Sequence, residues 1–335
     1  MKTPRTPFHE SIRFSGRAVF FFLGLVLIAG LQPNPAFSLD LLLGTGKAGT
    51  FSHFVGRTIC RIIDRNAEGL NCTAVPGPGD VHNLTNLQGG SLDLALVDAQ
   101  MLYDARRKAG KFQFLDIGYE ALRLLAPVYD SAVTLVVRKD ASVSSLDELR
   151  GKRINIGRPL SPVRFAVNTL LEAKNWSLDD FSLVQELPAS QSQDTMAFCH
   201  GTIQAMLQIG VHPDSRLQQL FELCEADIVD MADEDIRKMV RLHPAFTMVE
   251  IPAGTYPQHG KSFTTFATTV VLAVSADLDE ETVAAISEAM YSQRRRLAST
   301  HPALSTFSLE PDRQPKIGIE SHPGVDAYRK RIGIQ

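Results

Sequence analysis

Short apolar runs alternate along the chain with segments whose apolar residues recur at helical spacing. The run 39–43 ends in a glycine-bearing turn at 44–50, and apolar side chains then follow at Phe54, Ile59 and Ile62. This order predicts a strand, a glycine turn and a helix. The pattern then repeats, which is typical of an α/β fold in which helices connect parallel strands.

The same pattern predicts the remaining elements. Predicted strands are 70–75, 92–97, 122–128, 132–138, 153–156, 202–207 and 266–274. Predicted helices are 80–88, 144–152, 163–174, 193–200, 212–224, 233–242 and 279–300. A second α/β unit begins at the glycine-proline turn 157–162. Helix N-termini present free N–H groups and a partial positive charge, so two such turns facing across a cleft would bind a carboxylate-bearing solute.

The N-terminus has the order of a secretory signal. Basic residues come first, an apolar run occupies 18–31, and prolines and small residues follow up to Ser38. This is the order that an export signal needs, and the run is shorter than the roughly 20 residues of a membrane-spanning helix. We expect residues 1–38 to be a cleaved signal peptide. The alternative is an uncleaved anchor that tethers the same globular body.

Charge and length narrow the classes of function. Residues 1–38 hold four Lys or Arg and one Glu, so the remainder has 30 Lys and Arg against 36 Asp and Glu. This mildly acidic balance argues against a nucleic-acid partner, which is normally bound by a basic surface. A mature chain of about 300 residues is also longer than most single hydrophobic cores, so two lobes are expected.

Four cysteines lie in two close groups beyond the predicted signal peptide. In an exported chain an even count suggests disulfides. The grouping favours Cys60–Cys72 and Cys199–Cys224 over the crossed connectivities. A zinc site is the alternative, although no Cys-x-x-Cys or paired His spacing accompanies these residues.

Two nucleotide-binding motifs are matched only in part. Gly44, Gly46 and Gly49 have the spacing of the dinucleotide-binding turn, but the next predicted strand ends at Val75-Pro76 without the acidic residue that holds the ribose. The phosphate-binding loop of nucleotidases would need Ser or Thr after Lys47, where Ala48 stands. Neither Gly-x-Ser-x-Gly nor His-Glu-x-x-His occurs. An enzyme is therefore the weakest class.

Segments along nearly the whole mature chain carry a family resemblance. They are Gly44-Thr45-Gly46-Lys47-Ala48-Gly49-Thr50-Phe51, Val81-His82-Asn83-Leu84, Gly90-Ser91-Leu92-Asp93-Leu94-Ala95, Gly151-Lys152-Arg153, Gly157-x-Pro159-x-Ser161, His212-Pro213, Ile251-Pro252-Ala253-Gly254-Thr255-Tyr256, Ser275-Ala276-Asp277-Leu278, His301-Pro302-Ala303 and His322-Pro323-Gly324. In this order they resemble the TAXI-type solute receptors of tripartite ATP-independent periplasmic (TRAP) transporters. The two cysteine pairs are similar to those of a subset of that family.

The resemblance implies an α/β fold of the periplasmic binding protein-like type II class, with two lobes, a hinge and a ligand cleft. It implies a periplasmic receptor that passes a small anionic solute, glutamate-like or another carboxylate, to a membrane-embedded permease, with no catalysis, cofactor or metal. By the same resemblance, the ligand-binding residues are Thr45, Lys47, Thr50, Phe51, Asp80, Asn83, Asp98, Arg158, Ser161, Arg164 and His212.

The sequence departs from the family pattern at several of these positions. Lys47 stands where glycine is usual, Phe51 where a tyrosine is common, and 76–80 replaces a Thr-Gly-Gly-Ser stretch. Basic residues beside Asp80 and Asp98 fit a solute with both a carboxylate and a polar or cationic end. The same basic side chains would equally suit a solvated cleft rim.

We expect lobe I to comprise 39–130 with 268–335, and lobe II to comprise 131–267. Two strand crossings between the lobes would form a hinge, and a solute that touches both lobes would favour the closed state. An orphan or signalling module of the same fold is the alternative function. It differs from a transport receptor by its partner, a sensor instead of a permease.

Overall fold

The computed structural model describes residues 38–188 and 192–334. Residues from Leu39 onward form one compact unit. The predicted signal peptide, except for Ser38, lies outside the described residues.

The sheet contains strands from the whole of this unit. The strands are β1 Leu39–Thr45, β2 Leu70–Pro76, β3 Leu94–Asp98, β4 Leu122–Arg138, β5 Arg153–Asn155, β6 Leu183–Gln185, β7 Ala205–Gly210, β8 Ala226–Val229, β9 Phe246–Ile251 and β10 Phe263–Ser275. They follow the order β2-β1-β3-β10-β4-β7-β5-β6, with β8 also paired to β4 and β9 also paired to β10.

The helices connect and cover these strands. The α-helices are α2 Phe51–Asn66, α3 Asp80–Gln88, α4 Ala99–Arg107, α5 Pro162–Lys174, α6 Ser192–Cys199, α7 Ser215–Leu223, α8 Glu234–Leu242, α9 Glu280–Ser292, α10 Arg294–Thr300 and α11 Pro323–Ile332. Short 3₁₀ turns are η1 Gly110–Phe112, η2 Lys139–Ala141, η3 Leu146–Leu149, η4 Leu178–Asp180, η5 Pro302–Thr306 and η6 Pro311–Arg313.

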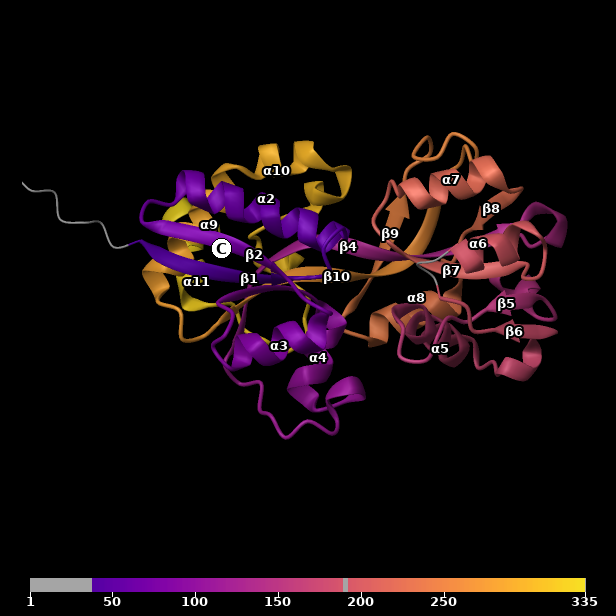
Figure 1. Cartoon of the computed structure of the whole chain (residues 1–335), viewed down its shortest axis with the longest axis horizontal. Coiled ribbons are helices and arrows are strands. Elements are labelled where there is room, and N and C mark those ends of the chain that lie inside the picture. The colour runs from indigo at the N-terminus through magenta and orange to yellow at the C-terminus, as the bar shows by residue number, and fades with distance from the viewer. Residues whose placement is uncertain (1–37, 189–191, 335) are drawn as a thin grey trace, which may run out of the picture. The chain divides into compact units, whose positions relative to one another are not determined.

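The elements form two groups joined by β4 and β10 (Figure 1). Half A contains β1–β3, α2–α4 and α9–α11, and half B contains β5–β9 and α5–α8. Two hydrophobic clusters draw on 41–129 and 270–328, together with Ala245. Two others draw only on 133–266. Each half therefore has its own core, and the two long strands cross from one to the other.

The first helix shows how the sequence fixes this packing. Thr50 caps α2 by accepting a hydrogen bond from the His53 backbone N–H, which satisfies an otherwise unpaired donor. One face of the helix then buries Val55, Ile59 and Ile63 completely against the sheet. Each of these side chains contributes about 1.5–3 kcal/mol relative to an exposed position.

Four predictions about the elements were wrong. The predicted helix 144–152 is only a 3₁₀ turn, Leu146–Leu149. The predicted strands 122–128 and 132–138 are one strand, β4, because the polar pair Asp130-Ser131 continues to pair with β10 instead of turning. The predicted helix 279–300 is interrupted at Gln293. The sheet is mixed: β1, β2 and β3 pair in parallel, as do β5, β6 and β7, whereas β4 and β10 are antiparallel to their neighbours.

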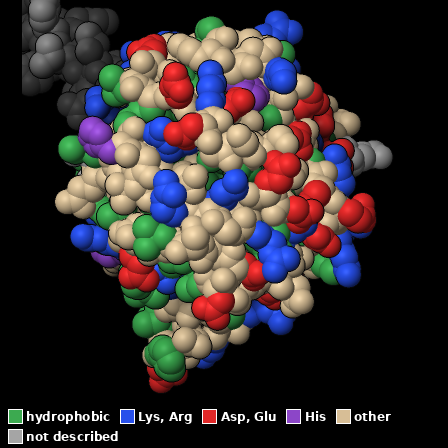
Figure 2. Space-filling view, turned by 90° about the vertical axis from the view of Figure 1, so that its right-hand side faces the viewer, with side chains coloured by type: hydrophobic (Ala, Val, Ile, Leu, Met, Phe, Trp, Pro, Cys, Tyr) green, Lys and Arg blue, Asp and Glu red, His purple; other side chains and the backbone are tan. Residues whose placement is uncertain are grey.

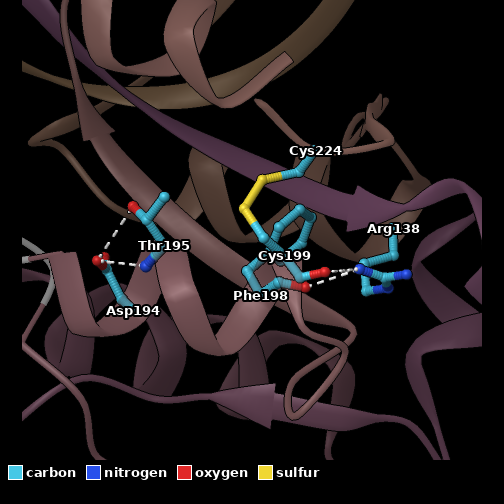
Figure 3. Close-up of a disulfide and its surroundings, with 6 residues drawn as sticks. All are labelled: Arg138, Asp194, Thr195, Phe198, Cys199 and Cys224. Atoms are coloured by element: carbon cyan, nitrogen blue, oxygen red, sulfur yellow. Dashed lines mark hydrogen bonds between the residues drawn. A yellow bond between two sulfur atoms is a disulfide. The ribbon is translucent and has the colours of Figure 1, made fainter. Parts of the chain in front are cut away.

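Both predicted disulfides are present. Cys60 on α2 bonds to Cys72 on β2, with Cα atoms 4.7 Å apart, and Cys199 bonds to Cys224 at 5.1 Å, both within the usual range for disulfides. Figure 3 shows that Arg138 donates hydrogen bonds to the carbonyls of Phe198 and Cys199, at the end of α6. This end of half B is thus held by a covalent link and by a cation on the final helical carbonyls.

Candidate functional site

The glycine turn after β1 is held by its own neighbours. Thr45 is completely buried, and its Oγ1 lies 3.1 Å from the Val75 carbonyl oxygen and 2.9 Å from His53 Nδ1. Asn83, also buried, donates from Nδ2 to the Thr45 carbonyl at 3.0 Å. These two predicted ligand residues therefore fix the turn against β2 and α3.

The rest of this turn is more open. Lys47 is exposed, and its carbonyl accepts hydrogen bonds from the backbone N–H and hydroxyl of Thr50. Phe51 packs edge-on against Tyr129, at 5.0 Å between ring centroids, and against His301 at 4.7 Å. The Lys47 ammonium is consequently available to a solute, whereas Phe51 belongs to an aromatic cluster.

Acidic and hydroxyl side chains meet where β3 ends. We call Asp80, Asp98, Tyr129 and Thr268 the strand-end cluster. Asp98 caps α4, accepting from the Gln100 backbone N–H at 2.8 Å, and its other oxygen accepts from the Thr268 hydroxyl at 2.5 Å. The Asp98 backbone N–H in turn donates to Asp80 at 3.4 Å. Both oxygens of Asp98 are therefore already engaged.

Proton binding in the strand-end cluster is perturbed. Burial, reinforced by the neighbouring charge of Asp98, raises the pKa of Asp80 to about 7. Burial raises the pKa of Asp98 to about 6 despite its hydrogen bond from Thr268. Burial also raises the pKa of Tyr129. The charges of Asp80 and Asp98 add to this increase, and a hydrogen bond with the Ser52 hydroxyl opposes it. Such shifts occur most often at functional sites.

The corresponding turn of half B presents one exposed and one engaged arginine. Arg158 is exposed, while Ser161 caps α5 by accepting from the Arg164 backbone N–H at 3.1 Å. The Arg164 guanidinium donates to the carbonyls of Ile156 and Gly157 and pairs with Glu186. The donors of Arg164 are therefore used within half B, where they bind the backbone that follows β5.

His212 lies in a defined hydrogen-bond chain after β7. The Tyr256 hydroxyl accepts from the Asp214 backbone N–H at 2.7 Å and lies 2.6 Å from His212 Nδ1. His212 Nε2 lies 2.9 Å from the Thr134 hydroxyl, so both ring nitrogens are within hydrogen-bond distance of a hydroxyl group. Burial lowers the pKa of His212 to about 4, which keeps the ring neutral.

A cavity of about 1100 Å³ lies between the halves. Half A contributes 302–303, 305–306 and 312–316, and half B contributes His212, Pro213 and all of β9. Asp130 and Ala132 of β4 and Thr269 of β10 also line it. We call this the inter-half cavity. Its volume is slightly above the range typical of small-molecule sites, about 300–1000 Å³.

The structure divides the predicted site residues between two places. Thr45, Asp80, Asn83 and Asp98 come together around the strand ends, whereas among the predicted residues only His212 lines the inter-half cavity. Sequence reasoning missed Asp130, which accepts from the Thr269 hydroxyl at 2.8 Å. Its signal was an acidic residue between the predicted strands 122–128 and 132–138.

Three further observations concern nucleic-acid binding, metal binding and membrane insertion. On the face of half B shown in Figure 2, basic and acidic side chains are interspersed and form no basic stripe. Within residues 38–188 and 192–334, no group of three or more His, Cys, Asp or Glu side chains is arranged to hold a metal ion. None of the helices in these ranges is long and apolar enough to cross a membrane.

Similar solved structures share the fold at low sequence identity. A TctC solute-binding protein from Polaromonas aligns with a TM-score of 0.54 and 13% identity, covering 90% of this chain and 99% of its own. The periplasmic sulfonate-binding protein SsuA from Methylobacillus flagellatus has a TM-score of 0.50 and 14% identity, covering 78% and 70%. A Xanthomonas citri protein solved with ATP has a TM-score of 0.51 and 15% identity, covering 88% and 100%.

These likenesses establish an α/β fold of the periplasmic binding protein-like type II class. A family model provides the closer assignment, since it matches residues 43–333, which is nearly all of the described chain. The chain belongs to the NMT1-like family.

Proposed function

We propose that the protein is an exported, periplasmic solute-binding receptor of the TAXI type, which delivers a small anionic solute to a TRAP-type membrane permease without catalysis. Membership of the NMT1-like family and the fold shared with solute-binding proteins support the receptor role. The sequence segments from the glycine turn 44–50 to 322–324 support the TAXI assignment.

One observation carries this proposal: the carboxyl ends of parallel strands from both halves approach the same stretch of β10. Asp98, the last residue of β3, pairs with Val270. Gly210, the last residue of β7, pairs with Ala132 of β4, which itself pairs with Ala267. In open α/β sheets, ligands bind outside the carboxyl ends of the strands, so a solute here would touch both halves.

We propose that lobe I comprises 39–130 with 268–335 and that lobe II comprises 131–267. The separate cores of the two halves and the crossings by β4 and β10 support this division. Contacts between the halves suit a closed arrangement: Tyr103 packs edge-on against His243 at 5.5 Å, and His301 hydrogen-bonds to the Pro213 backbone. A solute that binds both lobes would stabilise this arrangement over an open one.

An anionic solute is proposed because exposed cations stand at both turns. Lys47 and Arg158 have accessible side chains, one on each half, beside the N-termini of α2 and α5. Ser161 and Arg164 would shape the turn that carries Arg158, and Thr45 and Asn83 would shape the turn that carries Lys47.

A thermal-shift screen of the mature chain against amino acids and organic acids tests the proposal. A solute present at 100 times its Kd would add about 2.7 kcal/mol of stability. Arg158→Glu should remove the shift, whereas Arg295→Glu, an exposed change on α10, should preserve it. If none of these compounds raises the melting temperature, the receptor function for this solute class is refuted. Solute uptake by cells with and without the protein then tests delivery to a permease.

A further inference from the structure

The two acidic positions near the crossing lie on opposite faces of β10. The Thr268 hydroxyl donates to Asp98, and the Thr269 hydroxyl donates to Asp130. Successive residues of a strand point to opposite faces of the sheet. The strand-end cluster and Asp130 are therefore separate places, and the inter-half cavity lies on the Asp130 face.

Space and unused hydrogen-bonding capacity distinguish the two faces. In the strand-end cluster, both Asp98 oxygens are engaged and Tyr129 is only 5% exposed. Asp130 is half-buried and has a hydrogen bond from Thr269, and it lies beside open space of about 1100 Å³. A solute can thus reach Asp130 without displacing the existing contacts of the cluster.

One wall of the inter-half cavity is the whole of strand β9. All six residues of Phe246–Ile251 line the cavity. Because alternate residues point to opposite faces, a space touched by all of them runs along the strand's edge. β9 pairs with β10 on one side, and no other described strand pairs with it. Half of its N–H and C=O groups therefore face outward, as on any edge strand.

The other walls combine apolar and charged side chains. Prolines 127, 213, 244, 252, 302 and 315 all line the cavity. Proline has no N–H, so these positions offer carbon surface, whereas Arg241, Arg313 and Lys316 bring positive charge to the same walls. An extended peptide suits this lining, because its main chain pairs with the edge of β9 and its ends carry an ammonium group and a carboxylate.

We propose that the solute of the inter-half cavity is a short peptide, which adds an extended strand to the free edge of β9 and places its N-terminal ammonium group on Asp130. The proposal rests on the receptor function alone and does not depend on an anion at the turns that carry Lys47 and Arg158. Main-chain pairing with an edge strand gives affinity for a peptide backbone, and alternate side-chain pockets give preference. At about 3.3 Å per residue, β9 has the length for a peptide of three to five residues.

The charges around Asp130 agree with this placement. β9 begins beside it, since Phe246 pairs with Thr268 and Asp130 pairs with Thr269. Burial raises the pKa of Asp130, and the cation that opposes this is Arg313, an exposed residue of the cavity wall. An ammonium group in the cavity would therefore stabilise the ionised form of Asp130 by a direct charge-assisted hydrogen bond, in addition to the charge of Arg313.

Calorimetric binding to the mature chain tests the inference. The probes are a mixed tripeptide library, the same library N-acetylated, trisarcosine, which has no amide N–H, and a mixture of free amino acids and organic acids. We expect the library to bind, the acetylated library to bind about 10- to 100-fold more weakly, and trisarcosine to fail. Losing a charge-assisted hydrogen bond has an effect of this size.

Variants locate the site. Asp130→Asn should weaken library binding by the same factor as acetylation, and Asp179→Asn, an exposed change of equal charge, should leave it unchanged. Acetylation acts on the folded wild-type protein, so it decides the question even if Asp130→Asn unfolds.

Three results would overturn the inference. Library binding that is lost in Asp98→Asn and retained in Asp130→Asn would place the peptide on the other face. Binding of amino acids or organic acids without peptides would refute the peptide and leave the receptor function standing. Binding of no probe would refute both.

Discussion

The raised pKa of Asp80 makes folding of the protein depend on pH in a defined direction. Asp80 faces Asp98 and Tyr129, and the charge of Lys111 opposes the increase in the pKa of Asp80. A carboxyl group whose pKa is 3.8 when unfolded and about 7 when folded holds its proton longer in the folded state. Stability is thus unaffected below about pH 4, falls as pH rises from about 4 to 7, and stays reduced above that.

The size of the effect follows from the two pKa values. Each pKa unit corresponds to 1.36 kcal/mol, so the difference between 3.8 and about 7 is equivalent to about 4 kcal/mol. Partial relaxation around Asp80 would reduce this to about 2–4 kcal/mol. Asp80→Asn removes the charge and keeps an oxygen that can accept the hydrogen bond from the Asp98 N–H. It should stabilise the protein by this amount at pH 8 and by almost nothing at pH 4.

Urea unfolding of the mature chain at pH 4, 6 and 8 measures these differences. Asp179→Asn is the matched control, since Asp179 is exposed and the substitution changes the net charge equally. Asp98 titrates in the same direction, so some pH dependence should remain in Asp80→Asn. Equal effects of the two substitutions at pH 8, or a wild-type stability that does not fall between pH 4 and 8, would refute the reasoning.

Three further predictions concern stability and are measured by urea unfolding. Replacing Cys199 and Cys224 by Ala should cost about 3–4 kcal/mol, because that disulfide closes a loop with a sequence separation of 25; an unchanged unfolding midpoint would contradict this. Arg164→Met should cost about 1–3 kcal/mol, since two carbonyls and Glu186 lose their partner, and Arg158→Met should cost little. Gly324→Ala should cost about 1–3 kcal/mol, because its Cβ would lie 2.4 Å from the Glu280 carbonyl oxygen of α9. Ala327→Gly on the same helix measures the difference in helix propensity between Ala and Gly, which by itself would favour Gly324→Ala.

The sequence was most informative where local physics decides the structure. The N-cap at Thr50, the glycine turn and the apolar face of α2 are all set by residues within 20 positions of one another. The two disulfides also join near neighbours in sequence. Elements of this kind could therefore be predicted without knowledge of the tertiary contacts.

Non-local pairing accounts for what the sequence did not show. Continuity of β4 across Asp130 depends on β10, which is more than 100 residues away, and the antiparallel direction of β10 depends on which strands it joins. The engagement of Arg164 likewise depends on Glu186 and on carbonyls that become neighbours only after folding. Residue type indicated a cation at that position, but not that its donors would be used internally.

The two acidic sites differ in what their charge contributes. Asp98 serves as a helix cap, a role that Asn could also fill, and its second oxygen accepts from Thr268, where the amide group of Asn could only donate. The charge of Asp80 is not required for folding, since ionisation of this buried carboxyl group lowers stability at neutral pH. A carboxylate whose charge does not stabilise the fold is expected to have a functional role, in which it binds either a proton or a cationic group of a solute. Because Thr268 and Thr269 are adjacent on β10, a peptide ammonium group on Asp130 and a proton on Asp80 or Asp98 would act on the same crossing strand from its two faces.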